Sequence, residues 1–352
     1  MNARVVIVAA VALAFALLGS GEASGRCAPP PDSGAGGAAA PKVDDAPSPI
    51  MADDPKGGEL LQQEEPKIQA RVERIEKELK GLDRKSLKDD DWAKEWAGVY
   101  YEGDGLGTNV TIRLAPKSGI GYLNYGCLGL YGGDHGDIVE AYPDGLKVKL
   151  AIGKAGGSYL TERLYFVRWG DQRYLVPDWG LMRIVNNYNE GGFARAAMFG
   201  VPRLRKEGEP RHRFDEGAPA GKPTLPPEYA KLLRGGGIKM KVSKVTGSPR
   251  KNVTNGVDVE AYTFEFATGS DDGVYVGMEF WYPSDQIAST GRVEIMRVDA
   301  KTSTGKFQAF LSAGERVTPP KVGDEISTMR SEIVLPKKEE NPPAEAPKKD
   351  DR

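Results

Sequence analysis

Short runs in which apolar and polar residues alternate constrain the fold of this chain more than any other feature. Apolar side chains occupy every second position in residues 110–114 and 146–152, and most of the positions between them are polar or charged. Successive side chains of a β-strand point to opposite faces, so this period of two predicts strands with one buried and one solvated face. Such strands are typical of antiparallel sheets.

Turn residues separate these runs and predict hairpins. The turn signals are GDG at 103–105, GGD at 132–134, PDG at 143–145 and GD at 170–171. Glycine, asparagine, aspartate and proline favour turns because they tolerate or fix the backbone angles that turns require. Hairpins at this spacing predict a β-sandwich or barrel.

A second series of short alternating runs begins at Ile238 and continues to about Leu335. The apolar residues of 257–261 and of 262–266 have opposite phases, which predicts a bulge or sharp bend between them. Several strongly bent strands in so short a stretch predict a small barrel. We therefore expect a mainly β protein: an antiparallel β-sandwich or barrel plus a second small β-barrel, with one short N-terminal helix and disordered ends.

The first 25 residues have the pattern of a secretory signal peptide. Arg4 is the only charged residue before Glu22, residues 5–18 are an uninterrupted run of fourteen apolar residues, and small residues follow at 23–25. A charged start, an apolar centre and a small-residue cleavage site are typical of such leaders. The alternative is a membrane anchor, but a spanning helix needs about 20 apolar residues. We expect export to the periplasm or beyond, and no transmembrane span after the leader is removed.

Apolar residues at heptad spacing predict a helix within residues 59–91. The stripe consists of Leu61, Ile68, Val72, Ile75, Leu79 and Leu82. Pro66 suits a first helical position and Gly81 suits a helix end. The stripe is too short for a regular coiled coil, so we expect it to dock on the following domain. A short self-associating helix is the alternative.

The expected segments follow from these patterns and from changes in composition. They are a signal peptide (1–25), a disordered tether (26–58), a helix and connector (59–91), a β-sandwich-like domain (92–206), a linker with a short helix (207–237), a small β-barrel (238–335) and a disordered tail (336–352). The tether and the tail contain little that could be buried in a core.

Composition and charge narrow the possible partners. The 48 lysine and arginine residues nearly balance the 50 aspartate and glutamate residues, so we expect no nucleic-acid partner. Two cysteines are too few for a disulfide scaffold or a thiolate metal site. Arg26 precedes Cys27, where lipoprotein processing favours a small residue, so we do not expect lipid attachment there. We expect no metal and no cofactor.

Three sequence blocks in the first β region form a distinctive set. They are W-A-G-x-Y-Y-x-G-D-G-L-G-x-N at 96–109, G-C-L-G-L-Y at 126–131 and R-W-G-x-x-x-Y-L-x-P at 168–177. On these blocks the chain resembles a family of exported bacterial proteins with no assigned function. The resemblance implies bacterial export and the same order of domains. It implies no substrate, cofactor or catalytic residue.

Asp134, His135 and Asp137 are the one compact group that could move protons or ligate a metal. Histidine can act as a base or a ligand, and neighbouring carboxylates can orient it. The alternative is a glycine-rich turn with ordinary solvated side chains. The chain has only two histidines, which excludes a three-histidine zinc site, and it lacks a G-x-S-x-G nucleophile motif.

The glycine-rich segment 103–109 and nearby aromatic residues supply the candidate binding residues. These are Tyr101, Asp104, Asn109, Tyr131 and Trp281. A phosphate-binding loop needs a helix after the glycines, whereas a strand follows here, so a shaped hairpin is the favoured interpretation. Exposed aromatic rings could stack on a sugar or a partner peptide; the alternative is that they fill the core and its rim.

These patterns lead us to expect an exported bacterial protein that acts as a non-catalytic binding or structural module of the envelope. Its expected partner is an envelope glycan or protein. Two alternatives stay open at this point. One is an extracytoplasmic hydrolase with an acid-based site near Asp134, His135 and Asp137. The other is a β-barrel that carries a small ligand in its interior.

Overall fold

The computed structural model describes residues 55–89, 91–103, 108–126, 129–153, 160–191, 201–205, 219–246, 252–254, 257–282, 292–312 and 320–329. The expected signal peptide, most of the expected tether and the expected tail lie outside these ranges. Contacts between Cα atoms divide the chain into two units. The first is Met1–Gly237 with Tyr275–Met278, and the second is Ile238–Val274 with Glu279–Arg352. Each unit is described by itself.

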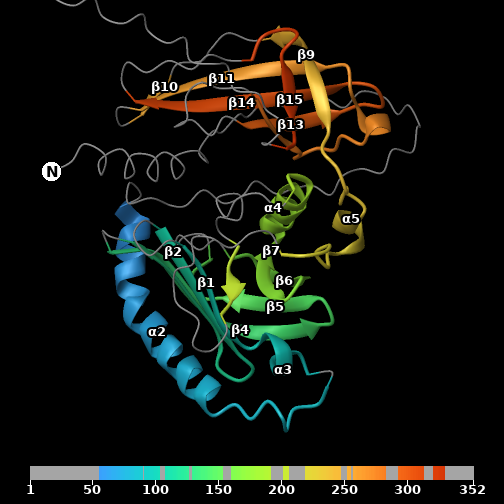
Figure 1. Ribbon diagram of the computed structural model, residues 1–352. Coiled ribbons are helices and arrows are strands. Elements are labelled where there is room, and N and C mark those ends of the chain that lie inside the picture. Colours follow the sequence, from blue (N-terminus) through green and yellow to red (C-terminus); the bar gives the residue numbers. More distant parts are fainter. Residues whose placement is uncertain are drawn as a thin grey trace, which may run out of the picture. The chain divides into compact units, whose positions relative to one another are not determined.

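The first unit is built around a closed antiparallel barrel of eight strands (Figure 1). The strands are β1 (Gly98–Gly103), β2 (Thr108–Ala115), β3 (Gly119–Gly126), β4 (Gly129–Tyr142), β5 (Gly145–Leu150), β6 (Arg163–Trp169), β7 (Gln172–Pro177) and β8 (Arg203–Leu204). The short strand β8 closes the barrel because it pairs with both β1 and β7.

The barrel interior is filled by apolar side chains from alternate positions of its strands, together with Trp96 of α3 and Leu160 before β6. The cluster consists of Trp96, Tyr100, Val110, Ile112, Leu114, Ile120, Tyr122, Leu146, Val148, Leu160, Leu164, Phe166 and Leu175, each at most 8% exposed. The period of two at 110–114 and 146–150 therefore marks the inward-facing positions, as alternation in a half-buried strand requires. The predicted run to residue 152 is too long, because β5 ends at Leu150 and Ile152 packs against the cluster of Ile68, Val72 and Leu123.

The helix α2 (Pro55–Lys80) lies along the outside of this barrel, against β2, β3 and β4 (Figure 1). Ile68 and Val72 form a second buried cluster with Leu123 of β3. Glycine makes room for the helix at Gly133, where an added Cβ would lie 2.9 Å from Cδ1 of Ile68. The apolar stripe therefore docks on the following domain, as predicted.

Pro66 does not begin this helix but lies inside it, and the helix begins at Pro55 rather than near Glu59. An internal proline removes one helical hydrogen bond and costs about 3 kcal/mol. Pro66 is on the exposed side, and Leu61 and Ile68 pack on the barrel on either side of it in sequence. Packing of the apolar stripe therefore offsets the preference of proline for the first position of a helix, which predicts a helix start at Pro66.

Among its described residues, the first unit also has three shorter helices: α3 (Trp92–Trp96), α4 (Asp178–Asn189) and α5 (Pro227–Ala230). Asp91 caps α3 by accepting a hydrogen bond from the backbone N–H of Ala93 at 2.9 Å. The buried side chain of Asn189 in α4 forms hydrogen bonds with the segment after α5, at residues 232–234. It donates to the carbonyl oxygen of Leu232 at 3.0 Å and accepts from the N–H of Arg234 at 2.7 Å.

The second unit is a sheet that closes on itself. Its strands are β9 (Lys239–Thr246), β10 (Asn252–Thr254), β11 (Val257–Phe266), β12 (Glu279–Trp281), β13 (Arg292–Val298), β14 (Ser303–Ser312) and β15 (Glu325–Ser327). The order is β10-β11-β14-β13-β12-β15-β9, and an additional pairing of β11 with β9 closes a ring of six strands. Phe264, Phe280, Val293, Ile295 and Phe307 are fully buried within it.

The predicted bulge between residues 261 and 262 is wrong. Strand β11 pairs with β14 in unbroken register from Val257 to Phe266. On its other edge β11 changes partners, from β10 at residues 257–259 to β9 at residues 263–266. The two halves of the strand therefore lie in different surroundings, which gives a physical reason for the change of apolar phase. The register shift that β11 does show lies further along the strand, opposite β9, between Glu265 and Phe266.

The expected fold class is confirmed: the protein is mainly β, with two barrels and few helices. The predicted turn at residues 132–134 is wrong, because these residues lie within β4. Gly133 serves close packing rather than a turn, since it faces the side chains of Ile68 and Leu61. Among the described residues, no helix is both long and apolar enough to cross a membrane.

Candidate functional site

Asp134 is a structural anchor in β4. Its side chain is fully buried and accepts hydrogen bonds from three backbone N–H groups: His135 at 2.7 Å, Ile152 at 3.0 Å and Gly153 at 2.7 Å. Burial raises the pKa of Asp134 above its ordinary value, although these bonds act to lower it. The carboxylate therefore holds the chain after β5 against β4.

His135 projects to the opposite face of β4, under helix α2. Its ring Nε2 lies 3.8 Å from Oε2 of Glu64, and its side chain is 15% exposed. Neither ring nitrogen has a hydrogen-bond partner among the described residues. Lys67 donates to Glu64 at 2.7 Å, which lowers the pKa of Glu64, and His135 adds to this effect. The histidine is thus covered by the helix rather than presented to a substrate.

Asp137 lies on the same face of β4 as His135 but has a different partner. Its Oδ1 accepts a hydrogen bond from Nη1 of Arg71 at 2.8 Å, and its side chain is 74% exposed. Asp134, His135 and Asp137 therefore share a strand but not a site. Within the described ranges, no group of three or more histidine, cysteine, aspartate or glutamate side chains is placed to hold a metal ion.

Tyr101 and Asn109 meet across the β1–β2 pair. The Tyr101 hydroxyl donates to Oδ1 of Asn109 at 2.6 Å, and the two residues are 8% and 1% exposed. Strands β1 and β2 pair as an antiparallel hairpin, with Gly103 opposite Asn109. This agrees with a shaped hairpin at residues 103–109 rather than a phosphate loop before a helix. Asp104 lies outside the described residues.

The other two candidate binding residues have separate surroundings. Tyr131 is half-buried and is skipped in the pairing of β3 with β4, where the register shifts. Trp281 is buried in the second unit, and the guanidinium carbon of Arg292 lies 4.3 Å from its ring centre. Tyr100 and Tyr122 are core residues of the barrel. Most of the aromatic residues singled out in the sequence therefore serve packing.

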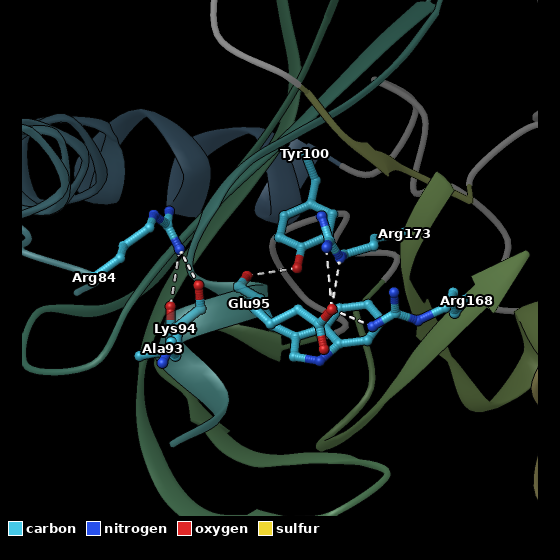
Figure 2. Close-up of polar contacts among 8 residues, drawn as sticks. Arg84, Ala93, Lys94, Glu95, Tyr100, Arg168 and Arg173 are labelled. Atoms are coloured by element: carbon cyan, nitrogen blue, oxygen red, sulfur yellow. Dashed lines mark hydrogen bonds and ion pairs between the residues drawn. The ribbon is translucent and has the colours of Figure 1, made fainter. Parts of the chain in front are cut away.

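A cluster of charged groups that the sequence did not reveal lies beside α3 (Figure 2). Oε1 of Glu95 accepts hydrogen bonds from Arg173, through Nε at 3.1 Å and Nη2 at 3.0 Å, and another from Nη2 of Arg168. Burial acts to raise the pKa of Glu95, but the two arginines outweigh it and hold the pKa below its ordinary value. The carboxylate is therefore ionised and shared between two cations.

Neighbouring bonds fix the position of α3 and of Glu95. Arg84 donates to the carbonyl oxygens of Ala93 and Lys94 at 2.9 Å (Figure 2). It also donates to the carbonyl oxygen of Ala97 at 2.6 Å. The buried Tyr100 hydroxyl donates to the carbonyl oxygen of Trp96 at 2.6 Å. A cation near the last carbonyls of a helix is electrostatically favourable, so these contacts hold the short helix in place.

Aromatic rings stack next to this cluster. The Phe166 ring lies 4.5 Å from the Trp96 ring at an interplanar angle of 11°, and 6.1 Å from the Trp92 ring at 25°. Phe166 and Arg168 are two residues apart on β6, so they project from the same face of the strand. Trp92 is half-buried. The β6–β7 end of the barrel thus combines an aromatic stack with a charged cluster.

The sequence carried one signal for this cluster. Arg168 and Arg173 flank the turn at Gly170 and Asp171, so a hairpin there would place the two arginines opposite each other. Glu95, however, is more than seventy residues earlier in the chain, and nothing in the local pattern links it to them. Only the closed barrel brings the segments together.

Comparisons with protein-family models, with curated proteins and with solved structures found no match to this chain.

Proposed function

We propose that this chain is an exported, non-catalytic binding or structural module of the bacterial envelope. The observation that carries the proposal is the dispersal of the candidate acid–base residues. Asp134 is bonded to backbone N–H groups, Asp137 is paired with Arg71, and His135 lies under helix α2.

Acid–base catalysis requires a different arrangement. A general acid or base must come within hydrogen-bond reach of one reacting group, and glycoside hydrolysis needs two carboxyl groups that face each other across a bound sugar. Asp134 and Asp137 instead have different partners on opposite faces of β4. This geometry favours the non-catalytic function over the hydrolase.

The packed interior of the first barrel bears on the small-ligand alternative. A barrel that carries a ligand needs an open cavity, whereas interior side chains of β1, β2, β3, β5, β6 and β7 pack on one another as a single buried cluster. This favours a binding surface on the outside of the barrel over a ligand held within it.

The envelope location rests on the leader pattern at residues 1–25 and on the resemblance stated above. It is tested by producing the full chain in a bacterial host, separating cytosol, membranes and periplasm, and sequencing the N-terminus of the recovered protein. We expect an exported protein that has lost the leader. Recovery of the intact chain from the cytosol would contradict the proposal.

The binding function is tested with the purified full chain. We expect retention on isolated cell-wall glycan or envelope fractions, and no hydrolysis of glycan, ester or peptide substrates. The control is His135→Ala, which removes the imidazole. Retention by no fraction would contradict the binding function, and a hydrolase activity that disappears in His135→Ala would favour the enzyme instead.

A further inference from the structure

The two arginines beside α3 are paired in a way that normally disfavours a hairpin. Arg168 and Arg173 are direct partners in the antiparallel β6–β7 pair. Like charges directly opposite each other repel, so such a pair is retained at a cost in stability unless an anion lies between them. Glu95 supplies one negative charge against two positive charges. The cluster therefore keeps one positive charge in excess.

The guanidinium groups also have unused hydrogen-bond donors. Each guanidinium carries five N–H donors in a planar fork. Arg168 uses one nitrogen and Arg173 uses two in binding Glu95, and the two side chains make no other hydrogen bond within the described part of the chain. Their side chains are 46% and 32% exposed. The remaining donors are open to water and to a second anion.

The aromatic stack next to the arginines favours a small ligand with a surface that can pack on an aromatic ring. Trp92, Phe166 and Trp96 form a continuous stack that ends in the half-buried Trp92. Aromatic side chains with a few polar groups at fixed positions are typical of small-ligand sites. A single excess charge in a chain with a net charge of −2 does not suit a nucleic acid, which requires many cationic contacts.

We propose that Arg168 and Arg173, which share the carboxylate of Glu95, bind the anionic group of an acidic saccharide at the β6–β7 end of the barrel. The guanidinium forks recognise a carboxylate or a phosphate, and the half-buried ring of Trp92, supported from below by the buried Phe166, contacts the sugar. This inference rests on the proposed binding function, for which it names a ligand class and a site.

The test uses the purified full chain and calorimetric titration at low and high salt. The probes are a galacturonate trisaccharide, glucose 6-phosphate and a neutral galactose trisaccharide. We expect an acidic probe to bind, the neutral one not to bind, and the affinity to fall as salt screens the arginines. Binding of galacturonate alone identifies a carboxylate ligand, and binding of glucose 6-phosphate alone identifies a phosphate ligand.

Four variants assign the site. The double substitution R168Q/R173Q should weaken binding by at least about tenfold, since it removes both charges and both forks. R168K/R173K keeps the charges without the forks and should lose less. Glu95→Gln removes the competing carboxylate and should raise the affinity. Arg74→Gln, an exposed site on α2, is the matched control and should change nothing. Circular dichroism checks that each variant is folded.

Three results would overturn the inference: no binding of either acidic probe, equal binding of the neutral probe, or an affinity unchanged in both double variants. Retention on envelope fractions separates this failure from failure of the proposed function. If R168Q/R173Q is retained to the same extent as the unchanged protein, the arginine site is wrong and the binding function stands. If the unchanged protein is retained by no fraction, the binding function itself fails.

Discussion

The strand segment 134–137 and the cluster around Glu95 both contain ionisable side chains, but the barrel treats them in opposite ways. Asp134, His135 and Asp137 are neighbours in sequence, and the fold gives each a separate set of partners. Glu95 and its two arginines are far apart in sequence, and the fold joins them at one oxygen atom. The first group is used in holding the protein together, whereas the second retains charge and donors for another molecule.

This difference shows that reactive residues close together in the sequence of a β protein do not necessarily form one functional site. Neighbouring positions on a strand point to opposite faces, so a short motif is divided by the sheet itself. Residues opposite each other in a hairpin are brought together instead. A candidate site is therefore better sought across paired strands than along one strand.

Removing the apolar support of the α2–β4 contact should have the largest effect. Ile68→Ala truncates a fully buried side chain, so we expect the free energy of unfolding of the first unit to fall by about 2–5 kcal/mol. Urea unfolding followed by circular dichroism measures the change. Gln69→Ala, at the adjacent exposed position, is the control and should change it by under about 0.5 kcal/mol. A comparably small loss for Ile68→Ala would mean that α2 does not depend on this docking.

Asp134→Asn tests whether the buried carboxylate is structural. It replaces one of the two acceptor oxygens with a donor, so we expect a loss of about 1–3 kcal/mol in the free energy of unfolding. The raised pKa of Asp134 means that the folded state binds its proton more tightly than the unfolded state. Its contribution to stability should therefore decline as pH rises from the ordinary carboxyl pKa through the raised value.

The pH dependence provides a second measurement on the same variant. The stability difference between the unchanged protein and Asp134→Asn should be largest at low pH and shrink as the pH approaches neutrality. Thermal or urea unfolding over that range measures it. A difference that grows with pH would show that the bonds to the N–H groups of Ile152 and Gly153 outweigh burial, and that the pKa is lowered.

Glu95→Gln tests the excess positive charge of the cluster formed by Glu95, Arg168 and Arg173. It leaves the partner arginines Arg168 and Arg173 without a counter-ion, so we expect a loss of about 1 kcal/mol that becomes smaller as salt is added. Urea unfolding at two salt concentrations measures it. Glu73→Gln on the exposed face of α2 is the matched control. Equal effects at both salt concentrations would contradict the electrostatic account.

The ion pair of Arg71 and the exposed Asp137 should contribute least to the free energy of unfolding. A double-mutant cycle with Arg71→Ala and Asp137→Ala should give a coupling energy of at most about 1 kcal/mol, because Asp137 is largely in water. A coupling energy well above this would mean that the pair holds α2 on the barrel and that Asp137, like Asp134, has a structural role.

The fold could be predicted from local patterns to a useful extent. Alternation at 110–114 identified inward-facing residues of β2, and the heptad stripe identified the side of α2 that docks. The errors came where a residue type has more than one use. Gly133 allows a close approach rather than a turn, and Pro66 is tolerated within a helix because packing compensates for it.

The candidate site could be predicted only in part. Tyr101 and Asn109 were identified and do meet, but as a buried structural contact. Arg168 and Arg173 lie in the β6–β7 hairpin, whose turn is recognisable in the sequence. The position of Glu95, however, depends on how α3 packs against the barrel. No local periodicity encodes that contact.

The sequence by itself determined which positions of β2 and β5 turn inward and where the turns after β4 and β6 lie, because strand alternation and turn chemistry act over a few residues. Tertiary structure alone decided which ionisable groups share a site. Closing a barrel joins strands that are distant in the chain, and the energy of a charged group depends on the burial and partners that only this closure provides.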